Sequence, residues 1–278
     1  MKKYSRAYVE ITNICNRSCS FCPGTSREPR MMSTEEFREI AGKVSEVTDY
    51  VYLHIMGEPL LHPSITDIIR IASECGLKCA ITTNGTLLPE LTDMLADSPL
   101  YKINISLHSY EGADIAEHER YVLDCARAAD TLSSRGILTV LRLWNVGHDG
   151  GRNDGTVKLL REYFNDCEWV SGARGVRIRD KLHIEFADRF TWPDMKEESV
   201  SDEIFCYGLK DHFGVLSDGR VVPCCLDREG TVTLGNIHDT PLTQILASER
   251  ACAMRDGFSQ RRAVEELCRR CPYARRFK

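Results

Sequence analysis

The chain has 278 residues, 42% of them hydrophobic, which is enough to bury a core and to form one large unit with a smaller one. Its 36 Lys and Arg residues against 41 Asp and Glu give a net charge of -5, so there is no general electrostatic reason to bind nucleic acid or an anionic membrane. The N-terminal stretch lacks the apolar run of an export signal, and no apolar run reaches membrane-spanning length. We therefore expect a cytoplasmic protein without a membrane partner.

Six apolar, β-rich runs alternate with helical patterns in the first two thirds of the chain. Strands are expected at residues 8–12, 50–55, 79–83, 102–107, 137–144 and 182–186, and helices at 33–47, 64–75, 88–96, 113–134 and 156–164. This alternation predicts a parallel sheet whose C-terminal strand ends carry the chemistry. The loops "CNRSC", "MGEP", "TNG" and "SLHS" follow the first four strands, so we expect them on one rim, with ordinary turns as the alternative.

A different pattern follows a charged, Pro-containing stretch at residues 191–204, which we interpret as a linker. The segment 205–278 begins with a hairpin that turns at Asp218-Gly219. Short helices are expected at 242–254 and 260–267. The sequence thus predicts domains at 1–190 and 205–278.

Thirteen cysteines are a high and odd number, which in a chain without an export signal indicates metal-binding or catalytic thiols. Three of them, Cys15, Cys19 and Cys22, lie within eight residues in "CNRSCSFC". A structural zinc site normally needs four ligands, whereas a 4Fe-4S cluster held by three thiolates keeps one iron open for a small molecule. The C-x3-C-x-aromatic-C spacing, with Phe21 as the aromatic residue, resembles the signature of the radical S-adenosylmethionine superfamily.

This resemblance implies a partial (β/α)6 TIM-like barrel in which S-adenosylmethionine binds the open iron. Its cleavage yields a 5'-deoxyadenosyl radical that abstracts a substrate hydrogen. "MGEP" is similar to the family's GGEP motif, although Met56 replaces the first glycine. The candidate cofactor contacts, from these motifs and from their expected place on the rim, are Phe21, Gly57, Glu58, Pro59, Thr83, Asn84, Ser106, His108 and Arg142. Turn roles are the alternative for Thr83, Asn84 and Ser106, and a structural ion pair fits Arg142 equally well.

A second set of cysteines occurs near the C-terminus as C-x17-C followed by C-x2-C: Cys206, Cys224, Cys268 and Cys271. Alone, such a set first suggests zinc. Behind a radical S-adenosylmethionine core it resembles the SPASM region or its shortened twitch form, a small cysteine-rich domain with a β-hairpin and short helices. We expect the twitch form because the chain ends seven residues after Cys271. The resemblance implies one auxiliary 4Fe-4S cluster with four cysteine ligands.

Two residues beside this set are candidate catalytic groups. Cys225 stands where related sulfatase-maturing enzymes have an aspartate thought to act as a base. Its thiol is a candidate hydrogen-atom donor, as in related epimerases, or a buried packing residue. Asp227 is a candidate base, or a surface loop carboxylate.

We expect an oxidoreductase that removes two electrons from a small polar molecule, with the auxiliary cluster taking the surplus electron as proposed for twitch dehydrogenases. The alternatives are epimerisation with Cys225 as donor, modification of a peptide or tRNA, and a non-catalytic metal-cluster module for binding or electron transfer. A peptide is less favoured because Cys15 leaves no room for a leader-binding domain before it. Residues 261–278 carry a local charge of about +5, which predicts docking of an acidic flavodoxin or ferredoxin as electron donor and leaves RNA possible; a solvated helix face is the alternative.

Overall fold

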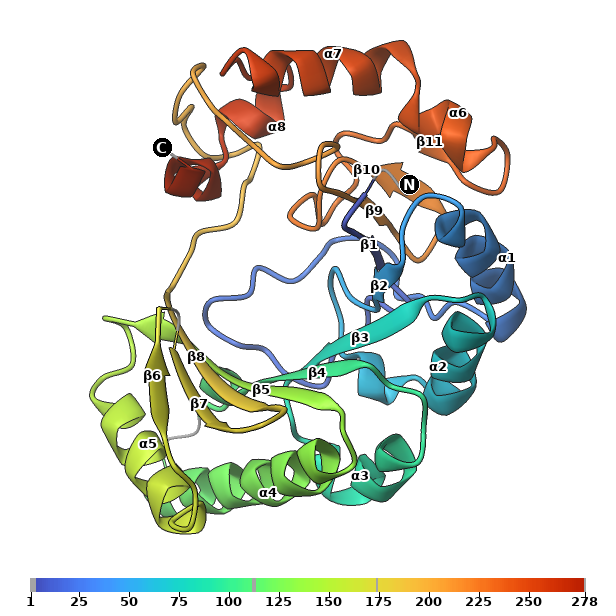
Figure 1. Cartoon of the computed structure of the whole chain (residues 1–278). Helices are drawn as coiled ribbons and strands as arrows, with labels where there is room; N and C mark the ends of the chain where they lie inside the picture. Colours follow the sequence, from blue (N-terminus) through green and yellow to red (C-terminus); the bar gives the residue numbers. More distant parts are fainter. Residues whose placement is uncertain (1–3, 112–113, 174, 278) are drawn as a thin grey trace. The chain divides into compact units, whose positions relative to one another are not determined.

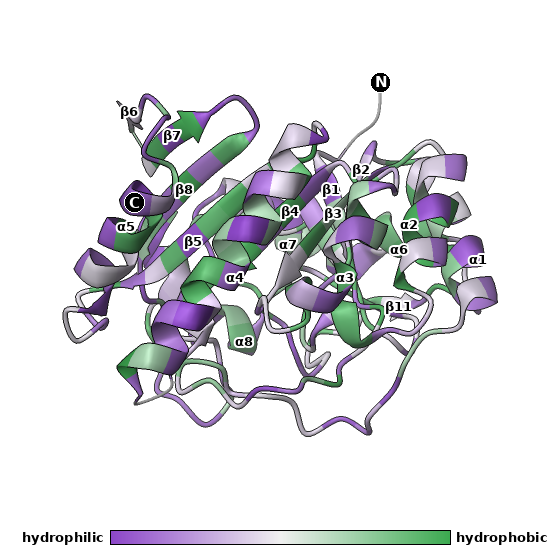
Figure 2. Cartoon of the chain, turned by 90° about the horizontal axis from the view of Figure 1, so that it is seen from below, coloured by the Kyte–Doolittle hydropathy of each residue, from purple (hydrophilic) through white to green (hydrophobic). Residues whose placement is uncertain are grey.

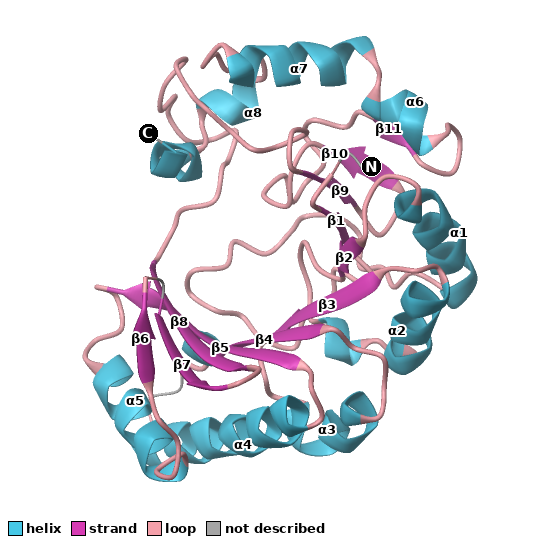
Figure 3. Ribbon diagram, viewed as in Figure 1, coloured by secondary structure: helices cyan, strands magenta, loops and turns pink. Residues whose placement is uncertain are grey.

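The computed structural model describes residues 4–111, 114–173 and 175–277, which form two compact units (Figures 1 and 3). The first unit comprises the described residues within 1–16, 22–78 and 190–278, and the second those within 17–21 and 79–189. The helix start expected at Ala113 lies outside the described residues. Among the residues described, no helix has the length and apolar character needed to cross a membrane.

The first unit is built on five strands in the order β11-β10-β9-β1-β2. Their bounds are β1 Arg6–Val9, β2 Tyr50–Tyr52, β9 His212–Val215, β10 Arg220–Val222 and β11 Gly235–Asn236. The central strand β1 pairs in parallel with both β2 and β9, while β9 and β10 form an antiparallel hairpin. The turn of this hairpin contains Asp218 and Gly219, as predicted, and the φ of +84° at Gly219 explains the glycine.

The helical elements of the first unit are α1 Thr34–Ser45, the 3-10 turn η1 Pro59–Leu61, α2 Ile65–Glu74, α6 Leu242–Leu246, α7 Glu249–Ser259, α8 Glu266–Arg269 and the 3-10 turn η3 Pro272–Phe277. The predicted capping box opens α1, because Ser33 and Glu36 each accept the other's backbone N–H. Phe37, Ile40 and Val44 follow at helical spacing and are fully buried.

The second unit has six strands in the order β3-β4-β5-β8-β7-β6. Their bounds are β3 Lys78–Thr83, β4 Lys102–Ser106, β5 Leu138–Val146, β6 Val170–Gly172, β7 Gly175–Arg179 and β8 Leu182–Asp188. Strands β3, β4, β5 and β8 are parallel, whereas β7 and β6 are added antiparallel at one edge. The connecting elements are α3 Leu88–Ala96, the 3-10 turn η2 Leu107–Ser109, α4 Ile115–Ser134 and α5 Arg152–Tyr163.

Helices α3, α4 and α5 cover one face of this second sheet (Figure 1). Figure 2 shows hydrophobic stretches along β4 and β5, and alternating hydrophilic and hydrophobic stretches along α4. Ile103 and Ile105 of β4 and Val122 of α4 are fully buried in this layer. The parallel strands therefore carry their loops at one common edge.

All six strands expected from the sequence are present, but three details differ. Strands β6, β7 and β11 were not predicted. The helix expected at 242–254 is two helices, α6 and α7, and the one expected at 260–267 is wrong, since only Glu266 and Leu267 of that range are helical. Arg261 has a φ of +56°, which ends the preceding helix, and Ala263 donates its N–H to the carbonyl of Asp202 instead.

Candidate active site

The cysteine loop after β1 is closed at its base by the side chains of "TN" in "ITNIC". Thr12 Oγ1 donates to the carbonyl oxygen of Arg30 at 3.1 Å, and the Arg30 amide donates to Asn13 Oδ1 at 2.7 Å. These bonds hold the two ends of the loop together. Within the loop, Cys15 and Cys22 are exposed and Cys19 is half-buried.

The middle of the loop, residues 17–21, belongs to the second unit and contacts the segment after β4. Cys19 Sγ lies 3.4 Å from the carbonyl oxygen of Ser109. Ser20 donates to the Glu111 carboxylate from both its amide and its hydroxyl, each at 2.6 Å. The "SLHS" loop therefore helps to position the central cysteine.

The "MGEP" loop lies directly against the backbone that leads into the cysteine loop. The Glu58 amide donates to the carbonyl of Ile14 at 2.9 Å. A Cβ at Gly57 would stand 2.4 Å from the carbonyl oxygen of Thr12 and 2.9 Å from that of Ile14, and the φ of this glycine is +78°. Only glycine fits this position without displacing one of the two loops.

Met56 fits where the family motif has glycine because its backbone is not in the left-handed region. Its side chain is buried beside Leu216, and its amide donates to Glu10 Oε2 at 3.1 Å. Glu58 is 2% exposed, and its carboxylate caps η1 by accepting the Leu60 amide at 3.0 Å. The carboxylate predicted to meet the cofactor amine is thus held in place by its own loop.

The loop after β3 is ordered by its own side chains. Thr83 Oγ1 accepts the amide of Gly85, and Asn84 Oδ1 accepts the amide of Thr86, each at 3.0 Å. The carbonyl of Asn84 accepts the hydroxyl of Ser109 at 3.1 Å, which joins this loop to the one after β4. These bonds are the turn roles that the sequence left open, and contact of Thr83 and Asn84 with the cofactor remains a prediction.

The structure brings the other rim candidates of the second unit together. Ser106 and Arg142 are register partners on neighbouring strands, and His108 Nδ1 lies 3.1 Å from the Arg142 carbonyl oxygen. The ring centroids of His108 and Phe21 are 5.0 Å apart. Burial lowers the pKa of His108, which favours its neutral form.

Arg142 forms the ion pair that was one of its two predicted roles. Its Nε lies 3.5 Å from Glu185 Oε2, and its guanidinium carbon lies 4.2 Å from the ring centroid of Trp144. The carboxylate and the aromatic face offset the cost of placing a guanidinium in an apolar strand. A cofactor or substrate contact of Arg142 stays a prediction.

The four C-terminal cysteines of the second set lie within the first unit. Cys206 precedes β9, Cys224 follows β10, Cys268 lies in α8 and Cys271 follows it. Burial, together with the nearby Cys271 thiol, raises the pKa of Cys206 to about 11. Burial also raises the pKa values of Cys224 and Cys268, and Cys206 and Cys271 contribute to both shifts. Such mutual effects require thiols that lie near one another.

Cys225 and Asp227 have different surroundings. The Cys225 thiol contacts the Tyr8 side chain, and burial raises the pKa of this thiol to about 11. Asp227 is 1% exposed, so it is not a surface carboxylate. Its two carboxylate oxygens accept the amides of Thr231 and Val232, each at 2.8 Å. This geometry favours a role in holding its loop, and neither residue's catalytic role is tested by it.

Sequence reasoning missed Glu10, a fully buried carboxylate at the start of the cysteine loop. Its Oε2 accepts Arg27 Nη2 at 2.6 Å, and its Oε1 accepts the hydroxyl of Ser217 at 2.9 Å. The available signal was a charged residue inside the apolar run "YVEIT", the same kind of signal that singled out Arg142.

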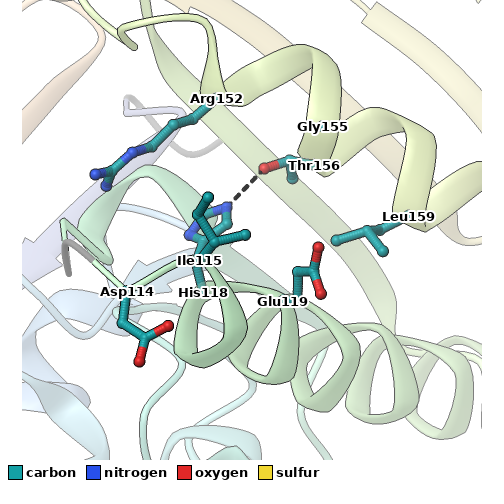
Figure 4. Close-up of a pocket in the computed structure, with 8 residues that line it drawn as sticks. All are labelled: Asp114, Ile115, His118, Glu119, Arg152, Gly155, Thr156 and Leu159. Carbon is teal, nitrogen blue, oxygen red and sulfur yellow. Dashed lines mark hydrogen bonds between the residues drawn. The ribbon is translucent and has the colours of Figure 1, made fainter.

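A small pocket of about 140 Å³ lies between α4 and α5 (Figure 4). It is lined by Asp114, Ile115, His118, Glu119, Arg152, Gly155, Thr156 and Leu159. His118 Nε2 lies 3.0 Å from Thr156 Oγ1, so this histidine bridges the two helices. None of the predicted site residues lines this pocket, and we assign it no function.

Comparison with known proteins identifies the family. The model of the Radical SAM superfamily matches residues 9–167, more than half of the chain. The chain belongs to the Radical SAM superfamily. A second model, that of the SPASM iron-sulfur cluster-binding domain, matches residues 206–272. Both matches confirm the resemblances found in the cysteine motifs.

Curated relatives are similar over part of their length. GTP 3',8-cyclase of Chlorobaculum tepidum is 29% identical over 75% of this chain and 68% of its own. The AdoMet-dependent heme synthase of Methanosarcina barkeri is 30% identical over 40% of this chain, which spans only 32% of that relative.

Two solved structures share the fold. BtrN in complex with AdoMet and 2-DOIA has a TM-score of 0.61 at 19% identity and covers 98% of this chain and 94% of its own. The enzyme anSMEcpe with AdoMet and the Kp18Cys peptide also has a TM-score of 0.61, at 14% identity. This match covers 89% of the present chain and 82% of the anSMEcpe chain. At such identities the likeness shows the fold alone, and it confirms the predicted partial barrel with a C-terminal SPASM region.

Membership in the superfamily and the SPASM match imply S-adenosylmethionine, a 4Fe-4S cluster and an auxiliary cluster. The donor sets fit these groups, because thiolates are the usual ligands of iron-sulfur clusters. The contact of Gly57 with the backbone of Thr12 and Ile14 fits a cofactor held between "MGEP" and the cysteine loop. Within the described residues, no three His, Cys, Asp or Glu side chains are arranged to hold a single metal ion.

We predict that Gly57→Ala weakens binding of S-adenosylmethionine to the reconstituted protein at least about tenfold, since the added Cβ forces the "MGEP" loop off the backbone of Thr12. Anaerobic calorimetric titration measures the affinity. Gly42→Ala is the matched control, because Gly42 lies in α1 with open space around its Cβ position. Equal affinities of the two variants would contradict the assigned role of this loop.

Proposed function

We propose that this Radical SAM enzyme removes two electrons from a small polar molecule. The observation that carries the proposal is the set of four half-buried thiols within the SPASM match, namely Cys206, Cys224, Cys268 and Cys271. Four cysteine ligands close a cluster completely, and a closed cluster suits electron transfer rather than coordination of substrate.

We assign Cys15, Cys19 and Cys22 as ligands of the radical cluster, and Gly57 and Glu58 as contacts to the methionyl amine of the cofactor. When bound, these groups supply hydrogen-atom abstraction at the open cluster and an acceptor for the surplus electron at the closed one. The protein's own part is positional. The bonds at Thr12 and Asn13 close the cysteine loop, and η1 fixes the Glu58 carboxylate.

A small polar substrate is supported by two of the matches. BtrN, which covers 98% of this chain at a TM-score of 0.61, was solved in complex with AdoMet and 2-DOIA. The GTP 3',8-cyclase relative, whose name also states a small polar substrate, supports the same class.

Epimerisation with Cys225 as hydrogen donor is the second candidate. The half-buried Cys225 thiol stands next to Cys224 and contacts Tyr8 on β1. A thiol in this place is suited to returning a hydrogen atom to a substrate radical, which would leave the substrate's oxidation state unchanged. The fate of the attacked carbon therefore separates the two functions.

We predict that turnover in heavy water gives a product lighter than substrate by two hydrogens and without deuterium at the attacked carbon. Mass spectrometry of anaerobic reactions with 2-DOIA, GTP and a small-metabolite extract as probes measures this. Cys225→Ser serves as the variant that separates the two functions, because oxidation does not need this thiol. Deuterium at the attacked carbon in the wild type, lost in Cys225→Ser, would replace oxidation by epimerisation.

The basic C-terminal segment is the surface we propose for an acidic flavodoxin or ferredoxin. Part of its charge is already used, because Arg269 pairs with Asp202 at 3.1 Å and Arg270 pairs with Glu266 at 2.6 Å. Arg275 and Arg276 of η3 are exposed, and the Arg276 guanidinium also lies over the rings of Phe190 and Tyr273. Lys278 lies outside the described residues.

We predict that Arg275→Glu with Arg276→Glu slows reduction by flavodoxin about tenfold at low salt and leaves reduction by dithionite unchanged, since opposite charges steer protein encounter. Stopped-flow absorbance of the clusters measures both rates. Arg127→Glu with Arg135→Glu makes the same charge change on exposed arginines of the second unit and is the control. Equal rates of cluster reduction by flavodoxin in the two double variants would contradict the proposed docking surface.

A further inference from the structure

Glu10 gathers donors from three distant parts of the chain within the first unit. It accepts Arg27 Nη2 at 2.6 Å, the Met56 amide at 3.1 Å, and both the amide and the hydroxyl of Ser217 at 3.1 and 2.9 Å. Its side chain is fully buried, so these donors replace water. One carboxylate thus joins the cysteine loop, the "MGEP" loop and the hairpin of the SPASM region.

Arg27 extends this connection toward the auxiliary cysteines. Its side chain is 8% exposed, and its Nε donates to the carbonyl of Arg228 at 2.8 Å while its Nη2 contacts Glu10. Arg228 stands four residues after Cys224. The Arg27 guanidinium therefore connects two parts of the protein. On one side it binds the segment that follows Cys224, and on the other it binds Glu10, whose carboxylate accepts the Met56 amide of the "MGEP" loop.

A second contact runs beside the first. The Glu229 carboxylate accepts the amide of Ser26 at 3.1 Å and its hydroxyl at 2.8 Å, as well as the hydroxyl of Thr25 at 3.2 Å. Residues 25–27 of the cysteine loop are thus held by residues 228–229 through backbone and side-chain bonds together. We call Glu10, Arg27 and Glu229 the clamp.

We propose that Arg27 is a positioning residue through which assembly of the auxiliary cluster sets the binding geometry for S-adenosylmethionine. A cluster at Cys224 fixes the segment that carries the Arg228 carbonyl, and Arg27 transfers that position to Glu10 and so to the Met56 amide, directly before Gly57. The inference rests on the proposed ligand role of Cys224. It adds that the two clusters are coupled through protein contacts.

The chemistry of arginine explains why this residue type is needed. Its planar guanidinium presents separate donors in a fixed fork, so it can bind a carboxylate and a carbonyl at the same time. A lysine keeps the charge opposite Glu10 but offers one ammonium in place of the fork. Arg27→Lys should therefore preserve the buried ion pair and lose the connection to Arg228.

The test measures cofactor affinity without turnover. Electron paramagnetic resonance of the reduced, reconstituted protein follows the change in the radical-cluster signal as S-adenosylmethionine is added. We expect Arg27→Lys and the ligand variant Cys268→Ala with Cys271→Ala each to weaken binding about tenfold, with iron content unchanged in the first and reduced to about four per chain in the second. Combining Arg27→Lys with the ligand variant should weaken binding no further than the weaker of the two alone, because both act through one connection.

The control is Arg38→Lys, a change in a surface ion pair with Glu74 in the same unit. Three results would overturn the inference. The first is losses that multiply when Arg27→Lys is combined with the ligand variant, which would mean that Arg27 acts independently of the auxiliary cluster. The second is an Arg27→Lys affinity equal to that of Arg38→Lys, and the third is full iron content in Cys268→Ala with Cys271→Ala, which would remove the ligand assignment.

Should Cys268→Ala with Cys271→Ala not fold, Glu229→Gln takes its place, since it weakens the parallel contact to Ser26 without touching a ligand. It should weaken binding of S-adenosylmethionine, whereas affinity equal to that of Arg38→Lys would count against the clamp. The two proposals can fail independently. A protein in which Arg27→Lys weakens binding of S-adenosylmethionine, but which yields no oxidised product, would contradict the proposed oxidation and leave the role of Arg27 intact.

Discussion

A carboxylate removed from water must meet donors on every side, and Glu10 imposes this requirement on the start of the cysteine loop. Its donors come from Arg27, Met56 and Ser217, so satisfying one charge brings together three loops that are far apart in sequence. Removing one partner of such a buried pair typically costs about 3–5 kcal/mol, which makes the arrangement persistent. The loops that carry the proposed chemistry are therefore positioned by a residue that itself does none.

Backbone contact adds a second constraint on the same loops. Gly57 stands so close to the carbonyls of Thr12 and Ile14 that no side chain fits, and the Glu58 amide donates to Ile14. Strands β1 and β2 pair in parallel, and the loops that make these contacts follow the ends of the two strands. Radical SAM chemistry needs a cofactor held in one orientation, and the short distances here are suited to that demand.

Much of the fold was predictable because the periodicities of strands and helices are local features of the sequence. The family was predictable because the spacing of the cysteines matches its signature. The capping box at Ser33, the six barrel strands and the hairpin at Gly219 all followed from short patterns. The helix expected at 260–267 failed because Arg261 adopts a left-handed backbone, which apolar spacing does not reveal. The Glu10–Arg27 ion pair was not predicted, because its burial depends on which distant segments of the chain meet in the fold. The burial of Asp227 could not be predicted for the same reason.

The most direct test of the account is whether the reconstituted protein forms 5'-deoxyadenosine from S-adenosylmethionine under anaerobic reduction by dithionite. Liquid chromatography with mass spectrometry detects the product, and iron analysis accompanies it. We expect product from the wild type with about eight irons per chain, and no product from the Cys15→Ala, Cys19→Ala, Cys22→Ala variant, which retains about four. No product from a wild type that binds about eight irons, or persistent product from the triple variant, would contradict it.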